Sequence, residues 1–575
     1  MLKDEIIEIG ITDQTDDGKG IGHAGGMAVF VSGAAAGDVV RARVTKVKKR
    51  YAFAVCEEVL KPSPHRIKPM CPYLADCGGC AFGELSYEKE LEIKRQHVIE
   101  KLRRIGGVED ADTLVRDIVG MGMIDDSANY NGTPLYSRAG TLDDAACVPQ
   151  GYRNKTVMAV DPATASVGYY ARASRRITDC EACMLQAPPA GAAARALRGY
   201  LMSHPGADIH SLMVKTAFAT GEVMVVIGSG SGGLDDEEDL ICALDDAILL
   251  LNDEAREDAP EYSLESVAVT YGRREAGSFF GAHTEIIAGR NTIEDELLGL
   301  RFEISPESFY QVNPVQAAKL YDKALEYAQA GTAGTVFDLY CGTGTIGLIA
   351  ASRGAEEVIG IESVRSAVLD ANRNAVINGI VNARFVCGKA EDELPKILAE
   401  RTGGSKEVII LDPPRAGCAE SLLDAAALAS PERIVYISCD PATLARDVKY
   451  LRTRGYELIE AAPFDLFGRT AHVETVCLLS KLSEAKHHIS VQLDMDELDL
   501  TSAESKAIYE EIQEWVQEKY GFHVTHLNIA KTKRKCGMIE RINYNLPKSD
   551  NSKSPGTPKE KEDAIINAFR HFQMI

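Results

Sequence analysis

The chain has 575 residues, of which 45% are hydrophobic and 26% charged, so it is long enough to form several hydrophobic cores of a globular protein. It contains neither a run of 18 apolar residues nor a basic start followed by an apolar stretch, which argues against a membrane span and a signal peptide and favours a cytoplasmic protein with reduced cysteines. The net charge of −22 excludes a generally basic surface, so any nucleic-acid binding must depend on local basic clusters.

Residues 1–60 are predicted to form a small β-barrel. The stretches EIIEIGITD, MAVFVSG, DVVRARVTKVKKR and YAFAVCEEVL alternate apolar and polar positions, with Gly-rich turns between them. The third stretch carries a basic cluster that consists of Arg41, Arg43, Lys46, Lys48, Lys49 and Arg50. We interpret the barrel as an RNA-binding module; a barrel that only packs against its neighbours is the alternative.

The next segment, MCPYLADCGGCAF, spaces Cys71, Cys77 and Cys80 as C-x5-C-x2-C. Three thiols this close in a Gly-containing loop can converge on a metal, where thiolates suit an iron–sulfur cluster or zinc. A fourth ligand must come from elsewhere, and ITDCEACMLQ offers Cys180 and Cys183. If this stretch is a strand, the two cysteines face opposite sides and only one reaches the loop. Free thiols are the remaining alternative.

A helix is predicted over residues 86–106, where apolar residues recur with charges between them and Gly106 ends the pattern. Residues 121–150 are rich in Gly, Asp, Asn and Ala and are interpreted as an exposed insertion. Strand character resumes at GYRNKTVMAV. We therefore expect a mixed α/β central domain over residues 61–295.

Residues 296–482 contain strand, Gly-rich turn and helix units. In TVFDLYCGTGTIGL an apolar strand runs into a turn with Gly342 and Gly344, whose backbone can approach a cofactor closely. A second strand, EVIGIE, ends in Glu362, placed to accept hydrogen bonds from ribose hydroxyls. A third, VIILDPPRAG, ends in Asp412. The glycines alone also fit an NAD-dependent oxidoreductase, which stays open as an alternative.

The stretch VYISCDPATLARD places Cys439 at the carboxyl end of a strand and before a helix. Open α/β sheets hold their chemistry at this edge. We expect the N–H groups of the helix start to lower the pKa of the thiol and to make it a nucleophile. A buried packing cysteine is the alternative.

These motifs, over roughly residues 1–482, resemble the class I S-adenosylmethionine-dependent RNA (uracil-5-)-methyltransferases. The resemblance implies a TRAM barrel at the N-terminus, Cys439 as the nucleophile, and Glu474 in HVETV as the base that takes the C5 proton. It implies a cofactor site that comprises Gln311 of SFYQVNP, Tyr340, Gly342, Gly344, Glu362 and Asp412. It also implies a 4Fe-4S cluster on Cys71, Cys77, Cys80 and Cys183.

Residues 483–575 lie beyond the resemblance. A capping-box pattern at Thr501–Glu504 precedes a helix through YEEIQEWVQEKYG, followed by a strand at FHVTHLNIA, a basic hairpin at KTKRKCGMIERINYN, a linker and a last helix. The hairpin carries Lys531, Lys533, Arg534, Lys535 and Arg541. We expect a small α+β appendage that binds RNA, with a domain that only packs on the enzyme as the alternative.

The sequence therefore predicts a multidomain α/β protein: an OB-like barrel (1–60), a mixed α/β central domain with an iron–sulfur loop (61–295), a Rossmann-like methyltransferase domain (296–482) and the appendage (483–575). The expected function is methylation of uridine C5 in RNA, with 23S rRNA preferred over tRNA. A non-catalytic iron–sulfur RNA-binding protein is the alternative of another class. No obligate protein partner is indicated.

Overall fold

A computed structural model describes residues 1–121, 149–172, 174–230, 233–254, 260–272, 279–401, 406–481, 512–525, 528, 529, 532 and 559–571. The chain divides into two compact units, Met1–Glu484 and Ala485–Ile575. Most of the predicted insertion at 121–150 lies outside the described residues, as do the capping box at 501–504 and the basic residues predicted between 531 and 541.

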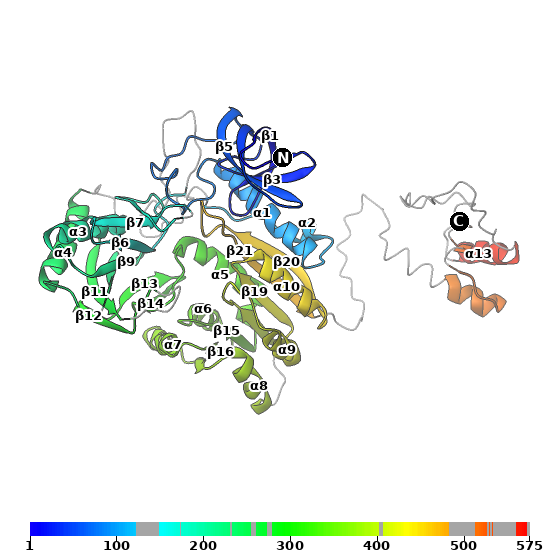
Figure 1. The fold of residues 1–575 in the computed structure, drawn as a ribbon. Helices are drawn as coiled ribbons and strands as arrows, with labels where there is room; N and C mark the ends of the chain where they lie inside the picture. The colour runs from blue at the N-terminus through cyan, green and yellow to red at the C-terminus, as the bar shows by residue number, and fades with distance from the viewer. Residues whose placement is uncertain are drawn as a thin grey trace. The chain divides into compact units, whose positions relative to one another are not determined.

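The first unit begins with the predicted barrel (Figure 1). Its strands are β1 (Ile6–Gln14), β2 (Gly20–Ala24), β3 (Met27–Ser32), β4 (Val39–Val47) and β5 (Tyr51–Lys61), closed in the order β1-β2-β3-β5-β4. Small and β-branched side chains such as Val29, Val31, Val44 and Ala52 fill the interior. They alternate with outward-facing residues, as the period of a strand requires.

Helix α1 (Tyr87–Arg104) confirms the helix expected at 86–106. The hydroxyl of Ser86 accepts a hydrogen bond from the backbone N–H of Lys89, which caps the first turn. Val98, Ile99 and Leu102 lie in one core with residues of the last sheet of this unit. The helix and the short α2 (Ala111–Leu114) thus belong to the covering of that sheet, although the sheet begins more than 200 residues later.

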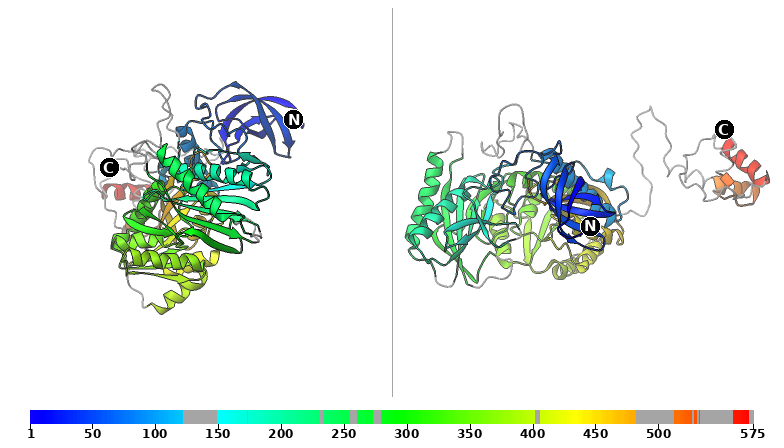
Figure 2. Two further views of the ribbon diagram at one scale, coloured as in Figure 1. Left: turned by 90° about the vertical axis from the view of Figure 1, so that its left-hand side faces the viewer. Right: turned by 45° about the horizontal axis from the view of Figure 1, so that its top comes forward.

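A seven-stranded sheet of order β12-β11-β10-β9-β6-β7-β8 forms the middle of the first unit. Its strands are β6 (Lys155–Asp161), β7 (Ser166–Tyr170), β8 (Ile177–Asp179), β9 (Ile209–Thr216), β10 (Glu222–Ser229), β11 (Ser263–Tyr271) and β12 (His283–Gly289). Helices α3 (Pro188–Ser203) and α4 (Glu237–Asp253) cover one face, as Figure 2 shows. The hairpin of β13 (Ile293–Leu297) and β14 (Leu300–Ile304) leads to the next sheet.

That last sheet has the order β17-β16-β15-β18-β19-β21-β20. Its strands are β15 (Thr335–Leu339), β16 (Glu357–Glu362), β17 (Ala383–Cys387), β18 (Glu407–Leu411), β19 (Arg433–Ser438), β20 (Tyr456–Phe464) and β21 (Glu474–Lys481). The first five in sheet order are parallel, whereas β21 is antiparallel to both β19 and β20. This doubly wound arrangement confirms the predicted α/β class.

Helices cover both faces of this sheet because most positions on both faces of its central strands are apolar and buried. Val336, Ile410 and Val435 face α5 (Pro314–Ala328) and α6 (Thr345–Ser352). Phe337, Leu411 and their neighbours face the opposite layer of α1, α8 (Ala390–Glu400), α9 (Glu420–Ala429) and α10 (Pro441–Arg452). Helix α7 (Arg365–Ile377) lies beside β17 and β14.

The described part of the second unit is helical. Residues 512–520 form a helix, and α13 (Lys559–His571) confirms the predicted last helix. The expected strand at FHVTHLNIA is wrong, because residues 523–525 are irregular and 528–529 are helical. Val524 and Ile529 pack with Ile512, Ile565 and Phe569 in a small core. The apolar residues of FHVTHLNIA therefore pack against helices and do not form one face of a strand.

Candidate active site

The predicted cofactor turn lies at the carboxyl edge of the last sheet, between β15 and α6. Tyr340, Gly342 and Gly344 all have positive φ angles, of 67°, 54° and 79°. Glu362, at the end of β16, accepts a hydrogen bond from the backbone N–H of Gly342 at 3.2 Å. Its other oxygen accepts from the N–H of Val364 at 2.8 Å. The carboxylate is thereby fixed beside the turn.

Two buried carboxyl groups adjoin this turn. Asp338 accepts the backbone N–H of Gly347 through one oxygen at 2.8 Å, while its other oxygen has no partner among the described residues. Burial raises the pKa of Asp338 to about 7. Asp412, directly after β18, has its pKa raised to about 7 by burial and by Asp338. Buried polar atoms need partners, so the turn fits a ligand that supplies hydrogen-bond donors.

The open space beside Gly342 also fits a bound ligand at this turn. No atom lies within 4 Å of the position that a Cβ on Gly342 would occupy. Gly344 differs, since a Cβ there would lie 2.8 Å from the ring of Phe385. One glycine therefore leaves room for a ligand, whereas the other permits close packing of the turn on the sheet.

Gln311 lies in the loop between β14 and α5 and is nearly buried, with 9% of its surface exposed. Its backbone carbonyl accepts a hydrogen bond from the side-chain amide of Asn154 at 3.0 Å. The side-chain nitrogen of Lys215 donates to the carbonyls of Ser305 and Ser308 at 2.8 and 2.9 Å. Side chains of the central sheet therefore hold the loop that carries the predicted cofactor glutamine.

The pairing of β19 with β21 explains how Cys439 and Glu474 come together. Cys439 follows Ser438, the last residue of β19, and Ser438 pairs with Thr475 of β21. Because β21 is antiparallel, its first residue, Glu474, lies at the edge where β19 ends. The negative charge of Glu474 raises the pKa of the Cys439 thiol, second to burial, which shows that the two groups are near one another.

The expected activation of Cys439 by the helix start is wrong. Burial raises the pKa of this thiol to about 11. The N–H groups at the start of α10 are not free for the thiol, because the carboxylate of Asp440 accepts those of Ala442 and Thr443 at 2.8 and 3.1 Å. The free enzyme therefore holds Cys439 as a thiol.

Only 5% of the surface of Glu474 is exposed, and its surroundings disfavour the ionised carboxylate. Burial, and then the charge of Asp412, raise its pKa to about 8, while Arg415 acts in the opposite direction. Arg415 also donates a hydrogen bond to Nε2 of His472 at 3.1 Å. Burial and this guanidinium lower the pKa of His472 to about 4, so the imidazole is neutral.

Arg415 and His472 are not among the predicted site residues. Both lie in motifs that carry the resemblance, three positions after Asp412 and two before Glu474. Their proximity to the motif residues is the signal that could have found them.

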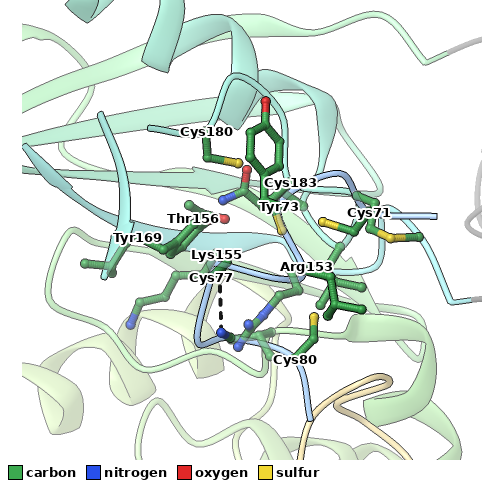
Figure 3. Close-up of a pocket in the computed structure, with 17 residues that line it drawn as sticks. Cys71, Tyr73, Cys77, Cys80, Arg153, Lys155, Thr156, Tyr169, Cys180 and Cys183 are labelled. Carbon is green, nitrogen blue, oxygen red and sulfur yellow. Dashed lines mark hydrogen bonds between the residues drawn. The ribbon is translucent and has the colours of Figure 1, made fainter. Parts of the chain in front are cut away.

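The predicted metal ligands lie in the central part of the first unit. Ala81, next to Cys80, donates its backbone N–H to the carbonyl of Arg469 at 2.8 Å, in the loop that precedes β21. Cys71, Cys77, Cys80 and Cys183 line one cavity of about 280 Å³ (Figure 3). In the described ranges, no three His, Cys, Asp or Glu side chains are gathered closely enough to ligate one ion. The four thiols thus share a cavity without forming a closed ligand set.

Cys180 also lines this cavity, so the expectation that it faces away from Cys183 is wrong. Strand β8 ends at Asp179, before either cysteine, and the alternation of a strand does not apply to them. Arg153 and Lys155 reach the same cavity and supply positive charge beside the thiols.

Comparisons with known proteins agree with these features. Residues 280–482 match the tRNA (uracil-5-)-methyltransferase family, and residues 3–56 match the TRAM domain. An uncharacterized RNA methyltransferase of Caldanaerobacter subterraneus is 37% identical over 489 residues, which are 83% of this chain and 98% of that protein. The chain belongs to the tRNA (uracil-5-)-methyltransferase family. A further RNA methyltransferase, from Clostridium tetani, is 33% identical over 84% of this chain and 98% of its own.

A solved structure supports the family and its fold. The Pyrococcus abyssi tRNA (uracil-54, C5)-methyltransferase in complex with S-adenosyl-L-homocysteine is 25% identical, covers 82% of this chain and 100% of its own, and has a TM-score of 0.59. The predicted TRAM barrel, the S-adenosylmethionine-dependent methyltransferase fold and RNA as the substrate class are therefore confirmed. In the described part of the chain, no helix is both long and apolar enough to cross a membrane.

Proposed function

We propose that this enzyme methylates C5 of a uridine in RNA through a covalent adduct between Cys439 and C6 of the base. Uracil C5 is a weak nucleophile. Loss of the S–H proton to solvent leaves the Cys439 thiolate, whose addition to C6 breaks the C5–C6 double bond and moves its electron pair toward C5, which then attacks a methyl group. S-adenosylmethionine, when bound, supplies that electrophilic methyl group.

Release of the product requires a base. After methylation, C5 carries both a proton and a methyl group, and Glu474 takes the proton while the C6–sulfur bond breaks and the double bond returns. A raised pKa makes Glu474 a stronger proton acceptor once it is ionised. The observation that carries the proposal is the antiparallel β21, which brings Glu474 to the end of β19 beside Cys439.

We further propose that the turn at the carboxyl edge of the last sheet binds the adenosine and methionine parts of S-adenosylmethionine. Glu362 is placed to accept hydrogen bonds from a ribose, while Tyr340, Gly342 and Gly344 shape the turn. Asp412 and Gln311 lie at the adjoining strand end and loop. An NAD-dependent enzyme with the same glycines is not supported, because the family to which the chain belongs transfers methyl groups.

As the RNA, we propose 23S rRNA, and with an RNA substrate we expect the enzyme in the cytoplasm. The preference depends on the cysteines, which in the resembling family accompany the rRNA enzymes. We propose that Cys71, Cys77, Cys80 and Cys183 hold a 4Fe-4S cluster with a structural or RNA-shaping role, supported by their shared cavity and by the affinity of thiolates for iron. tRNA is the second candidate, favoured by the substrate in the name of the Pyrococcus abyssi enzyme.

Two experiments test the proposal. Mapping of 5-methyluridine in rRNA and tRNA from cells with and without the gene identifies the substrate; an unchanged pattern in both RNAs refutes the function. Glu474→Gln should accumulate a denaturation-resistant protein–RNA adduct that requires S-adenosylmethionine and disappears when Cys439→Ala is added. If Cys439→Ala alone retains activity within tenfold of wild type, Cys439 is not the nucleophile.

A further inference from the structure

Three aromatic side chains form a cluster on the N-terminal barrel. The ring centroids of Phe30 and Tyr51 are 5.8 Å apart, those of Phe30 and Phe53 are 5.6 Å apart, and those of Tyr51 and Phe53 are 5.5 Å apart. Tyr51 is exposed, and the other two are half-buried. The rings contact one another at the spacing of attractive aromatic pairs. We call this surface the aromatic platform.

Strand pairing puts the platform on the outside of the barrel. Along β5, Tyr51 and Phe53 alternate with Ala52 and Ala54, which lie in the barrel core. Phe30 of β3 is directly opposite Phe53. The rings therefore contribute little to the core, and a ligand placed on them would remove further apolar surface from water.

Unpaired positive charge surrounds the platform. Lys46 is opposite Phe53 across the β4–β5 pairing, and the connection between these strands supplies Lys48, Lys49 and Arg50. All four are exposed, and none forms an ion pair with another described residue. Such a group is free to bind anions.

The other two basic residues of this strand differ. Arg41 pairs with Glu58 at 2.5 Å and with Glu8 at 3.5 Å, and Arg43 pairs with Glu57 at 2.6 Å. The basic cluster predicted from the sequence thus divides into a neutralised pair and a group of four without such ion pairs among the described residues. The group of four runs from Lys46, opposite Phe53, through the connection that ends at Tyr51.

We propose that the platform binds unpaired nucleotides of the RNA substrate, with bases stacked on the rings and phosphates beside the lysines. Aromatic rings offer stacking to any exposed base, and adjacent cations follow the backbone. A paired base has both faces covered within a helix and cannot stack on a protein ring. This role depends on the proposed function only in that RNA is the substrate. The barrel would then select single-stranded segments beside the target uridine.

The test compares labelled 12-nucleotide RNAs by fluorescence anisotropy with the full-length protein: a single strand, its duplex, and an abasic strand that retains the phosphates. Tyr51→Leu and Phe53→Leu should each weaken binding of the single strand about 5-fold or more, the effect of losing one stacked base. They should leave binding of the abasic strand unchanged. Leu60→Ala, at an exposed apolar position on the far end of β5, should leave both affinities unchanged.

Lys48→Ala with Lys49→Ala should weaken the single and abasic strands alike and should reduce the salt dependence by roughly 0.7 per lost phosphate contact. The inference is overturned if the leucine variants bind the single strand like wild type, if they weaken the abasic strand equally, or if the duplex binds more tightly. Thermal melts of each variant establish that the barrel remains folded. Binding is read without turnover, so a failure here is distinct from a failure of the methylation proposal.

Discussion

Lys94 of α1 provides a sharp test of how the N-terminal helix supports the active site. Its ammonium group is fully buried and donates to Asp465 at 2.7 Å, to Glu90 at 2.8 Å and to the carbonyl of Phe467 at 3.2 Å. Arg469, in the same loop, donates to Glu90 at 3.2 Å. This loop leads directly into β21 and Glu474.

Lys94→Met should destabilise the first unit by about 3–5 kcal/mol, because it leaves the buried Asp465 without an ion-pair partner among the described residues and Glu90 with Arg469 alone. Burial already raises the pKa of Glu90, and loss of Lys94 raises it further. A raised folded-state pKa gives stability that is present at low pH and lost as the pH rises. The destabilisation should therefore be larger at pH 8 than at pH 5.

Urea unfolding followed by circular dichroism measures this effect. Fluorescence would not, since the only tryptophan, Trp515, lies in the second unit. Lys89→Met is the matched control on the same helix: Lys89 pairs with Glu92 at 2.7 Å near the surface, where such a pair contributes about 0–1 kcal/mol. If Lys94→Met costs no more than Lys89→Met, the buried network does not hold the loop in place.

Three further outcomes are expected. Cys183→Ser should lose the iron and visible absorbance of anaerobically purified protein while Cys180→Ser keeps both; the reverse result makes Cys180 the fourth ligand. Glu474→Gln should raise the melting temperature more at pH 9 than at pH 5, since the pKa of about 8 means that wild type must ionise a buried group as the pH rises, and equal shifts would contradict this. Gly344→Ala should weaken S-adenosylmethionine binding in calorimetry by roughly 1–3 kcal/mol through strain at positive φ, whereas Gly455→Ala, also at positive φ but without close neighbours, should not alter it.

Local sequence was sufficient to place several residues of the candidate site at one sheet edge. Tyr340, Asp412 and Cys439 each follow an apolar strand directly, and the carboxyl ends of parallel strands meet at one edge. The position of Glu474 beside Cys439 required more, because β21 follows β20 along the chain but inserts between β19 and β20 in the sheet. Spacing does not reveal that insertion, so only the resemblance connected the two residues.

The charged partners of individual side chains were the feature of the structure that the sequence predicted least well. The segment around Arg41 and Arg43 reads as a continuous basic surface, but glutamates of β1 and β5 neutralise it across the barrel. Sequence position gives no indication of such cross-strand partners. The same holds for Cys180, whose orientation depends on where β8 ends.

The raised pKa of the Cys439 thiol bears on the step of the reaction at which the thiolate forms. Its neighbours Glu474 and Asp412 oppose the thiolate, burial opposes it further, and Asp440 takes the N–H groups of α10. The guanidinium of Arg415 favours the charged form but does not outweigh these effects. A thiol with a pKa of about 11 is also resistant to alkylation and oxidation at neutral pH.

We infer that the Cys439 thiolate forms only when a bound uracil accepts its electron pair at C6. Iodoacetamide labelling of Cys439, followed by peptide mapping, should therefore be slow in the free enzyme at pH 7. At pH 9, where the wild-type Glu474 is ionised, labelling should be faster in Glu474→Gln, which lacks the opposing charge. Rapid labelling of wild type at pH 7 would show that the thiolate is already formed.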